Sequence, residues 1–415
     1  MQTELRKTNF LDFSILIPYL ILAVFGLIMV FSTTVPTQLE KGANLYRPII
    51  SQSIFFVLSL IGMFIVFRIK LRAIKSQRLI AIVMLVLVFL LIYSRFGPGT
   101  YANGAHGWIP IPGVGTIQPA EFAKLFMIWY LSSVFATKQK EIRENDITAI
   151  FDQPKWYQNI YRGWRAWILL MLLIELIMPD LGNTIIMGLI ALVLIASSGI
   201  SFRWATGYGK FFVFLILAFF ALLFMTGGNL IPGSYINKRL LAFVNPFRTP
   251  AILADAGHQI ANGYYAISNG GWFGRGLGNS IEKNGYLPFA STDFVFPVVV
   301  EELGVIGAVL ILCVLFFLIL RIYLVGIRAR YPFNAMIAIG VGTMLLMQTF
   351  VNVGGAIGLI PETGVTFPFL SQGGSSLFVL SLAVALVLNV ESHERLENLN
   401  ELQRRHERNR PNYKK

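Results

Sequence analysis

Three carboxylates stand at the start of a long apolar run, in the stretch GYLPFASTDFVFPVVVEELG at residues 285–304: Asp293, Glu301 and Glu302. Ionisable side chains in such a position are costly and usually face a polar interior, where they serve a function. A positioned carboxylate can act as a general base by taking a proton from a hydroxyl group. Alternatively, Thr292 caps a helix and Asp293 lies in its first turn. Capping leaves Glu301 and Glu302 unexplained.

A second polar group precedes the apolar stretch at 119–137. Glu121 and Lys124 are three positions apart, so they lie on one face of a helix. They form either a self-satisfied ion pair or the charged wall of an external cavity. Trp108, earlier in the same segment, is either an interfacial aromatic residue or a binding residue.

Two further segments combine glycine with polar residues. Arg239 and the adjacent Lys238 are either anion binders or solvated charges. The glycines at 270–278 follow no predicted strand and lie in an external loop, which disfavours a nucleotide-binding loop. Residues 353–376 are rich in Gly, Pro and Ser. Such backbone is tolerated at membrane depth only where protein or water satisfies it. This segment therefore predicts a broken or re-entrant start to the last span, with hydrogen-bond donors directed at a cavity.

The composition defines the class of protein. The 415 residues are 55% hydrophobic and 13% charged, and a soluble chain carries about twice that charged fraction. The formal net charge of +13 comes from basic residues between apolar runs and in the tail, which argues against nucleic acid as a partner. A single cysteine and four scattered histidines exclude an intrachain disulfide and disfavour a structural zinc site. We predict an all-α polytopic membrane protein.

A spanning helix needs about 20 mostly apolar residues. By this criterion the chain has ten candidate spans, the first of them retained rather than cleaved as a signal peptide. They lie near 13–33, 51–68, 79–94, 119–137, 165–178, 183–200, 208–226, 294–320, 334–352 and 367–390.

The basic residues predict the orientation. Connections 68–78, 138–165 and 321–330 and the tail are rich in Lys and Arg, whereas 95–118, 179–182 and 353–366 contain only Arg95. The positive-inside rule then places both termini in the cytoplasm. We predict one transmembrane domain at 1–390, with a large structured extracellular loop at 227–293 between spans 7 and 8. A basic cytoplasmic tail follows at 391–415, either as a short helix or as a solvated segment.

Several separated motifs, taken in order, resemble the SEDS family (shape, elongation, division and sporulation). They are NGAHGWIPIPG, IQPAEFAK, PDLGN, KRLLAFVNP, GHQ, GGWFGRGLGNS, STDFVFPVVVEELG and NVGGAIGLIPETGVTFPFLSQGGSS. The resemblance covers nearly the whole chain and favours the division members over the elongation members. It departs from the family at Phe289 and Ser291, where members usually carry Glu and His.

The resemblance implies a peptidoglycan glycosyltransferase that polymerises the undecaprenyl-pyrophosphate-linked disaccharide-peptide lipid II. It implies Asp293 as the catalytic residue, and we add Glu301 to the substrate-binding residues that it suggests: Trp108, Glu121, Lys124, Arg239, Ser371, Gln372 and Ser375. It further implies assistance by a divalent cation such as Mg²⁺ or Mn²⁺, with no identified protein ligands. The expected partners are a class B penicillin-binding protein transpeptidase and other divisome membrane proteins, at the septal plasma membrane of a Gram-positive bacterium.

Two other functions remain compatible with the sequence. A lipid II flippase would also have many spans, broken helices and buried charge. Its cytoplasmic connections, however, lack matching charged motifs, and the chain shows no clear internal repeat. A noncatalytic division scaffold would bind partners through its helices and tail.

Overall fold

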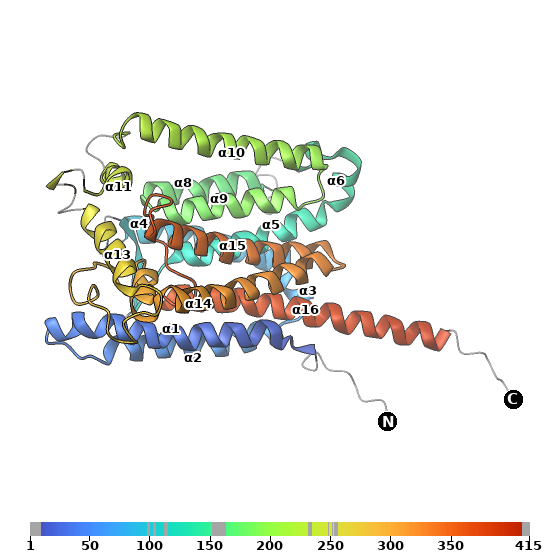
Figure 1. Cartoon of the computed structure of the whole chain (residues 1–415). Coiled ribbons are helices and arrows are strands. Elements are labelled where there is room, and N and C mark those ends of the chain that lie inside the picture. The colour runs from blue at the N-terminus through green and yellow to red at the C-terminus, as the bar shows by residue number, and fades with distance from the viewer. Residues whose placement is uncertain are drawn as a thin grey trace, which may run out of the picture.

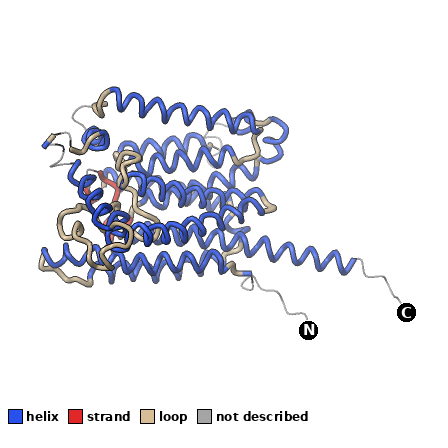
Figure 2. Tube along the Cα trace, in the orientation of Figure 1, coloured by secondary structure: helices blue, strands red, loops and turns tan. Residues whose placement is uncertain are grey.

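A bundle of long helices forms the molecule, with a small sheet and several loops at one end (Figures 1 and 2). The computed structural model describes residues 10–97, 100–102, 105–111, 115–151, 163–230, 235–247, 249–250, 252 and 256–408. The helices are α1 (Phe13–Glu40), α2 (Arg47–Arg68), α3 (Leu71–Ile74), α4 (Gln77–Phe96), α5 (Pro119–Thr137), α6 (Gln139–Asn145), α7 (Ile147–Phe151), α8 (Trp164–Ile177), α9 (Leu181–Ala196), α10 (Phe202–Met225), α11 (Tyr235–Val244), α13 (Ala256–Gly270), α14 (Val295–Arg328), α15 (Pro332–Ala356) and α16 (Gly374–Arg408).

The predicted all-α polytopic class is confirmed. Within the described residues, seven helices are long and apolar enough to cross a membrane: α1, α2, α4, α10, α14, α15 and α16. Each of the ten predicted spans overlaps a helix, but α8 and α9 are short and α5 carries Glu121 and Lys124 in its first turns. Ten spans therefore stays a prediction. The helix α16 also continues into the predicted tail, as far as Arg408.

The centre of the bundle is formed by helices far apart in the sequence. Helix α15 packs against α5, α9 and α14, while α16 packs along α2. Helix α10 is different, because Leu223 is its only buried residue, and it runs along one edge of the bundle (Figure 1). Its long apolar side chains are exposed, as expected for a surface that contacts lipid. The start of α1 and the end of α16 lie at the same end of the bundle (Figure 1).

Short strands were not predicted, yet three of them lie between α4 and α5. Strands β1 (Thr100–Ala102), β2 (Ala105–Ile111) and β3 (Gly115–Ile117) form an antiparallel sheet in the order β1-β2-β3. Trp108 of β2 is half-buried and opposite Thr100. Strands this short lack a clear alternation of polar and apolar residues, which explains why the sequence did not indicate them.

The last span starts later than predicted. Residues 367–373 are not helical, and α16 begins only at Gly374. The connection 357–373 between α15 and α16 is irregular, as its Gly, Pro and Ser content predicts. It packs closely on α1, because a Cβ atom on Gly26 would lie 2.0 Å from the carbonyl oxygen of Phe369. Helices α11 and α13 lie within the predicted extracellular loop.

Candidate active site

A break in α14 creates the attachment point for the loop that carries Asp293. Gly304 has a φ of 73° and a ψ of 175°, so α14 is interrupted there. The carbonyl groups of Glu301 and Glu302 accept hydrogen bonds from the amides of Arg275 (2.9 Å) and Gly276 (2.9 Å). The loop backbone thus replaces the helical hydrogen bonds lost at the break, as a buried backbone requires.

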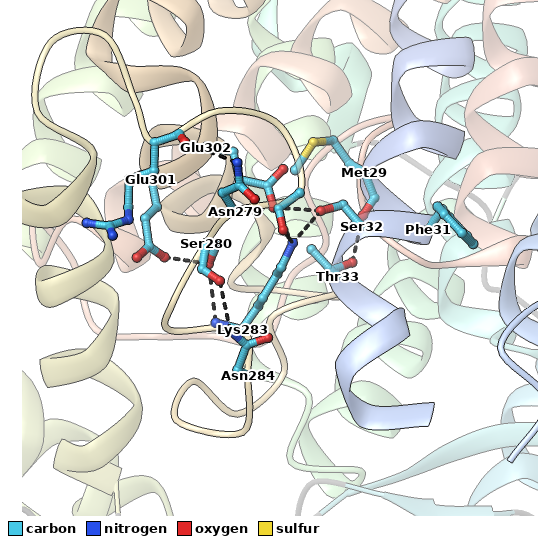
Figure 3. A network of polar contacts seen from close by, with 12 residues as sticks. Met29, Phe31, Ser32, Thr33, Asn279, Ser280, Lys283, Asn284, Glu301 and Glu302 are labelled. Atoms are coloured by element: carbon cyan, nitrogen blue, oxygen red, sulfur yellow. Dashed lines mark hydrogen bonds and ion pairs between the residues drawn. The ribbon is translucent and has the colours of Figure 1, made fainter. Parts of the chain in front are cut away.

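The Glu301 side chain fixes the same loop. It is fully buried, and its carboxylate accepts hydrogen bonds from Ser280 Oγ (2.5 Å) and the amide of Ile281 (3.0 Å). Figure 3 shows Ser280 directed at Glu301. The prediction of Glu301 as a substrate-binding residue is not supported by these contacts, because they hold its oxygens within the loop.

Glu302 makes a buried ion pair that joins α1 to this loop. Lys283 Nζ lies 2.6 Å from Glu302 Oε1 and 2.8 Å from Ser32 Oγ, and Ser32 Oγ itself donates to Glu302 Oε1 (2.6 Å). Figure 3 shows the three side chains meeting between α1, the loop and α14. The Lys283 and Glu302 side chains are 4% and 0% exposed. The carboxylates at 301 and 302 therefore hold the loop in place.

Asp293 lies directly before α14 and is 7% exposed. The predicted helix cap is wrong: the residue at the N-cap position is Phe294, whose side chain makes no capping bond. Thr292 Oγ1 instead donates to Asp293 Oδ1 at 2.7 Å. Asn352 of α15 donates to the carbonyl oxygens of both Asp293 (2.7 Å) and Val365 (2.7 Å), so it ties Asp293 to the irregular connection.

Ser371 and Gln372 also hold the segment before Asp293. Ser371 Oγ donates to the carbonyl oxygen of Thr292 (2.5 Å), and the amide of Gln372 donates to the carbonyl oxygen of Ser291 (2.7 Å). The structure thus brings these two predicted site residues to the backbone beside Asp293. Their role in this arrangement is to position the backbone.

Arg239 and Glu362 complete the surroundings of Asp293. Arg239 Nη2 lies 3.7 Å from Glu362 Oε1, and its Nη1 donates to the Glu362 carbonyl oxygen at 3.4 Å. A Cβ atom on Gly364 would lie 3.7 Å from Arg239 Nη1 and 4.0 Å from Asp293 Oδ2, so both side chains approach the same glycine. The Glu362 and Asp293 side chains line the same small cavity.

The environment of Glu362 alters its protonation. Glu362 lies in the connection between α15 and α16, outside the spanning helices. Burial raises the pKa of its carboxyl above the usual 4.5; Arg239 opposes this shift and Asp293 reinforces it, and the resulting pKa is about 8. At neutral pH Glu362 is therefore mostly protonated beside Asp293.

Two cavities meet at Glu362. The larger has a volume of about 860 Å³ and lies between α9, α10, α11 and α15. Among the described residues that line it, only Arg239 and Glu362 have ionisable side chains, and the others are mostly Leu, Ile and Phe. The smaller, of about 10 Å³, is bounded by Asp293, Asn352 and Glu362 and has room for roughly one water molecule. An apolar groove thus ends at a charged site.

The other predicted residues form a neighbouring cluster. Lys124 Nζ lies 2.9 Å from Glu121 Oε1, and both side chains are buried, which confirms the expected i,i+3 pair. Neither residue is among those lining the large groove. Ser375 Oγ accepts from the amide of Gln118 (3.3 Å), whose side chain donates to Asp180 (3.2 Å). No described hydrogen bond or ion pair joins Trp108 to Asp293.

The Asp293 site and the Glu121–Lys124 cluster meet where the first turn of α9 packs against residues 363–365. Gly182 in the first turn of α9 packs against residues 363–365, because a Cβ atom there would lie 2.4 Å from Val365 Cγ2 and 3.0 Å from the Thr363 carbonyl oxygen. Asp180, which caps α9 by accepting from the amide of Asn183 (3.1 Å), lies beside that contact. The first turn of α9 therefore supports the backbone next to Asp293.

Several residues of this site were not identified from the sequence. Glu362, Asn352 and Lys283 contact the segments that hold Asp293, and Asp180 accepts a hydrogen bond from Gln118 in the neighbouring cluster. Glu362 could have been identified from the sequence, because it is an ionisable side chain within an apolar, Gly- and Pro-rich segment. The others became apparent only from the packing of distant segments.

A divalent cation held by the protein needs side-chain ligands such as His, Cys, Asp or Glu. Among the described residues, no group of three or more His, Cys, Asp or Glu side chains could hold one. The implied divalent cation therefore has no protein site of that kind in the described part of the chain, and we assign no reaction step to it.

The fold and the site define a multi-pass, all-α membrane protein with an acidic and basic site at the end of an apolar groove. The family model of FtsW, RodA and SpoVE, described as cell cycle proteins, matches residues 13–396. The chain belongs to this family, which confirms the resemblance seen in the sequence.

Curated relatives share most of its length. It is 56% identical over 419 residues to the probable peptidoglycan glycosyltransferase FtsW of Lactococcus lactis, covering 99% of each chain. It is 34% identical over 390 residues to the probable peptidoglycan glycosyltransferase FtsW of Bacillus subtilis, covering 91% of this chain and 90% of the other.

Solved structures share the fold. A chain of a peptidoglycan synthase complex, described as coordinating polymerization and crosslinking, is 24% identical with a TM-score of 0.66, and the match covers 92% of this chain and 98% of that one. The rod shape determining protein RodA of Thermus thermophilus is 21% identical with a TM-score of 0.59, covering 92% and 97%.

Proposed function

We propose that this protein is a peptidoglycan glycosyltransferase of cell division, which polymerises lipid II with Asp293 as general base. The observation that carries the proposal is the apolar groove of about 860 Å³ that ends at Arg239 and Glu362, beside Asp293. A lipid-linked sugar has a matching order of parts: a long hydrocarbon chain, a pyrophosphate and then the reacting carbohydrate. The FtsW relatives and the family match support the same function.

The groove suits the hydrocarbon chain. It lies against the exposed helix α10, and its lining is dominated by leucine, isoleucine and phenylalanine. Burying apolar surface there contributes about 25 cal/mol per Å². A chain held in this groove places its pyrophosphate near Arg239, whose planar guanidinium suits phosphate oxygens.

Asp293 then has a defined chemical task. Its carboxylate takes the proton from the acceptor sugar hydroxyl, while the new bond forms between that oxygen and the anomeric carbon of the donor. The bond from the anomeric carbon to pyrophosphate breaks, and undecaprenyl pyrophosphate leaves. A single displacement inverts the anomeric centre, by analogy with inverting glycosidases. General-base catalysis of this kind contributes typically ~10²–10⁴-fold.

Stabilisation of the leaving group falls to Arg239. Its guanidinium lines the groove and contacts the carboxyl and carbonyl oxygens of Glu362. Positive charge placed beside the negative charge that develops in the transition state is among the largest contributions to the rate enhancement of an enzyme. Lys124 is directed at Glu121 and is fully buried, so we assign it no direct contact with the phosphates.

The proposal extends to partners and place. One structural neighbour belongs to a synthase complex that couples polymerization to crosslinking. We propose that this chain likewise works with a class B penicillin-binding protein transpeptidase and other divisome membrane proteins. Its place is then the plasma membrane at the septum of a Gram-positive bacterium.

One experiment separates the candidate functions. Purified full-length chain, with its cognate transpeptidase, is supplied with labelled lipid II in detergent and in vesicles. We expect glycan polymer. Translocation of lipid II in vesicles without polymer would favour a flippase, and neither product would favour a scaffold; either result would overturn the proposal.

A further inference from the structure

Glu362 has the features of a residue that affects the reaction by positioning Asp293. It lines both the apolar groove and the small cavity that Asp293 bounds. Its side chain is 6% exposed, and its Oε1 atom has no hydrogen-bond partner within the described part of the chain, although Arg239 Nη2 lies 3.7 Å away. A buried carboxyl oxygen without a hydrogen bond is costly, so this group is held here at a cost to stability.

The acidic side chains of Glu362 and Asp293 have Arg239 as a basic neighbour. The charged groups that face Glu362 are Arg239 from α11 and Asp293 from the segment before α14, and Gln259 from α13 is a polar neighbour. Two carboxylates that line one small cavity cannot both be ionised easily, so Glu362 holds a proton.

We propose that Glu362 is a positioning residue for the glycosyltransferase reaction, which holds a proton and donates it in a hydrogen bond to the Asp293 carboxylate. This inference rests on the proposed function of Asp293. The hydrogen bond fixes the Asp293 carboxylate and lets the second oxygen of Asp293 accept the proton of the acceptor sugar. Glu362 keeps its own proton throughout, so the proton balance of the reaction is unchanged.

The protonated form of Glu362 also attracts the Arg239 guanidinium less strongly than an ionised carboxylate would. A neutral Glu362 competes weakly for the guanidinium, so Arg239 can bind the pyrophosphate. An ionised Glu362 would pair fully with Arg239 and repel both Asp293 and the phosphates. Since the pKa of Glu362 is raised by burial to about 8, activity is expected to decline as the pH rises through that value.

The test is the pH profile of polymerisation by the full-length chain with its cognate transpeptidase. Wild type is expected to lose activity with an alkaline limb near pH 8. Glu362→Gln keeps the donor but cannot ionise, so its activity at pH 7 stays close to wild type and the limb disappears. Glu362→Ala removes the donor and is expected to lose ~10–100-fold at pH 7.

Glu282→Gln is the matched control. Glu282 is also buried in the described loop, and burial together with Glu301 raises the pKa of its carboxyl. Its replacement should leave the alkaline limb in place. A second measurement, infrared detection of a protonated carboxyl, is independent of activity: the band should titrate near pH 8 in wild type and be absent from Glu362→Gln.

The outcomes separate this inference from the function on which it rests. If wild type polymerises and Glu362→Gln retains the same alkaline limb, the inference is wrong and the function stands. A wild-type chain that makes no polymer overturns the proposed function and the inference with it. A loss of the limb in Glu282→Gln would also overturn the role of Glu362.

Discussion

The buried pair of Lys283 and Glu302 should be the strongest electrostatic anchor of the loop that carries Asp293. Lys283 Nζ lies 2.6 Å from Glu302 Oε1, 2.8 Å from Ser32 Oγ and 2.7 Å from the Gly278 carbonyl oxygen. Replacing Lys283 with Met keeps most of the side-chain volume but leaves Glu302 buried without its cation. Removing one partner of a buried pair costs about 3–5 kcal/mol.

The prediction has a second part that isolates the pair. Replacing both residues, as Lys283→Met with Glu302→Met, removes the uncompensated charge, and replacement of a buried pair by apolar residues is often close to neutral. The double variant should therefore be more stable than Lys283→Met. The coupling energy between the two sites should be at least ~2 kcal/mol, within the range seen for residues in contact.

The assay is equilibrium unfolding in mixed detergent micelles, followed by tryptophan fluorescence and analysed as a double-mutant cycle. Trp272 lies in the same loop and contributes to this signal together with the other six tryptophans. Polymerisation should fall in Lys283→Met and recover in part in the double variant. If the free energy of unfolding of Lys283→Met lies within about 1 kcal/mol of the wild-type value, the pair does not anchor the loop.

Two other predictions concern packing and pH. Gly182→Ala should reduce polymerisation, because its Cβ atom would lie 2.4 Å from Val365 Cγ2 and displace the backbone beside Asp293; Gly207→Ala in α10, with nothing within 4 Å, should leave polymerisation unchanged. Equal effects of the two substitutions would refute this. Asp12→Asn should cost about 1.5–3 kcal/mol at pH 7, since Asp12 accepts charged hydrogen bonds from Arg321 (2.8 Å) and Arg395 (2.7 Å). Burial raises the pKa of Asp12, but the hydrogen bonds outweigh it and the net pKa falls well below the usual 3.8. The stability advantage over Asp12→Asn is thus fully present above pH 3.8 and is lost progressively as the pH falls from there through the lowered pKa of the folded state, which thermal unfolding from pH 7 to about pH 1 would check.

Hydropathy was sufficient to predict the class of fold and the place of most helices. Apolar runs long enough to span a membrane fold as helices because backbone polar groups must be satisfied internally. The same reasoning missed the three strands before α5 and the break at Gly304. Both depend on local backbone geometry, and Gly304 adopts a φ of 73° because loop amides replace its helical partners.

The candidate site was predictable only in part. Asp293 and the serine-rich segment stood out as polar residues at the edges of apolar runs, whereas Arg239 was selected as a site residue through the family resemblance. Glu301 stood out for the same reason, yet it binds the loop backbone. Side chains with identical local signals thus differ in role, because distant segments decide what each carboxylate contacts.

The most direct test of the central claim is polymerisation of lipid II by Asp293→Asn. The substitution keeps the side-chain size and the backbone bond from Asn352, so the folded protein should persist. We predict a rate lower than wild type by ~10²–10⁴-fold in the purified complex, at equal amounts of folded protein. Polymer made at the wild-type rate by Asp293→Asn would contradict the assignment of Asp293 as the general base.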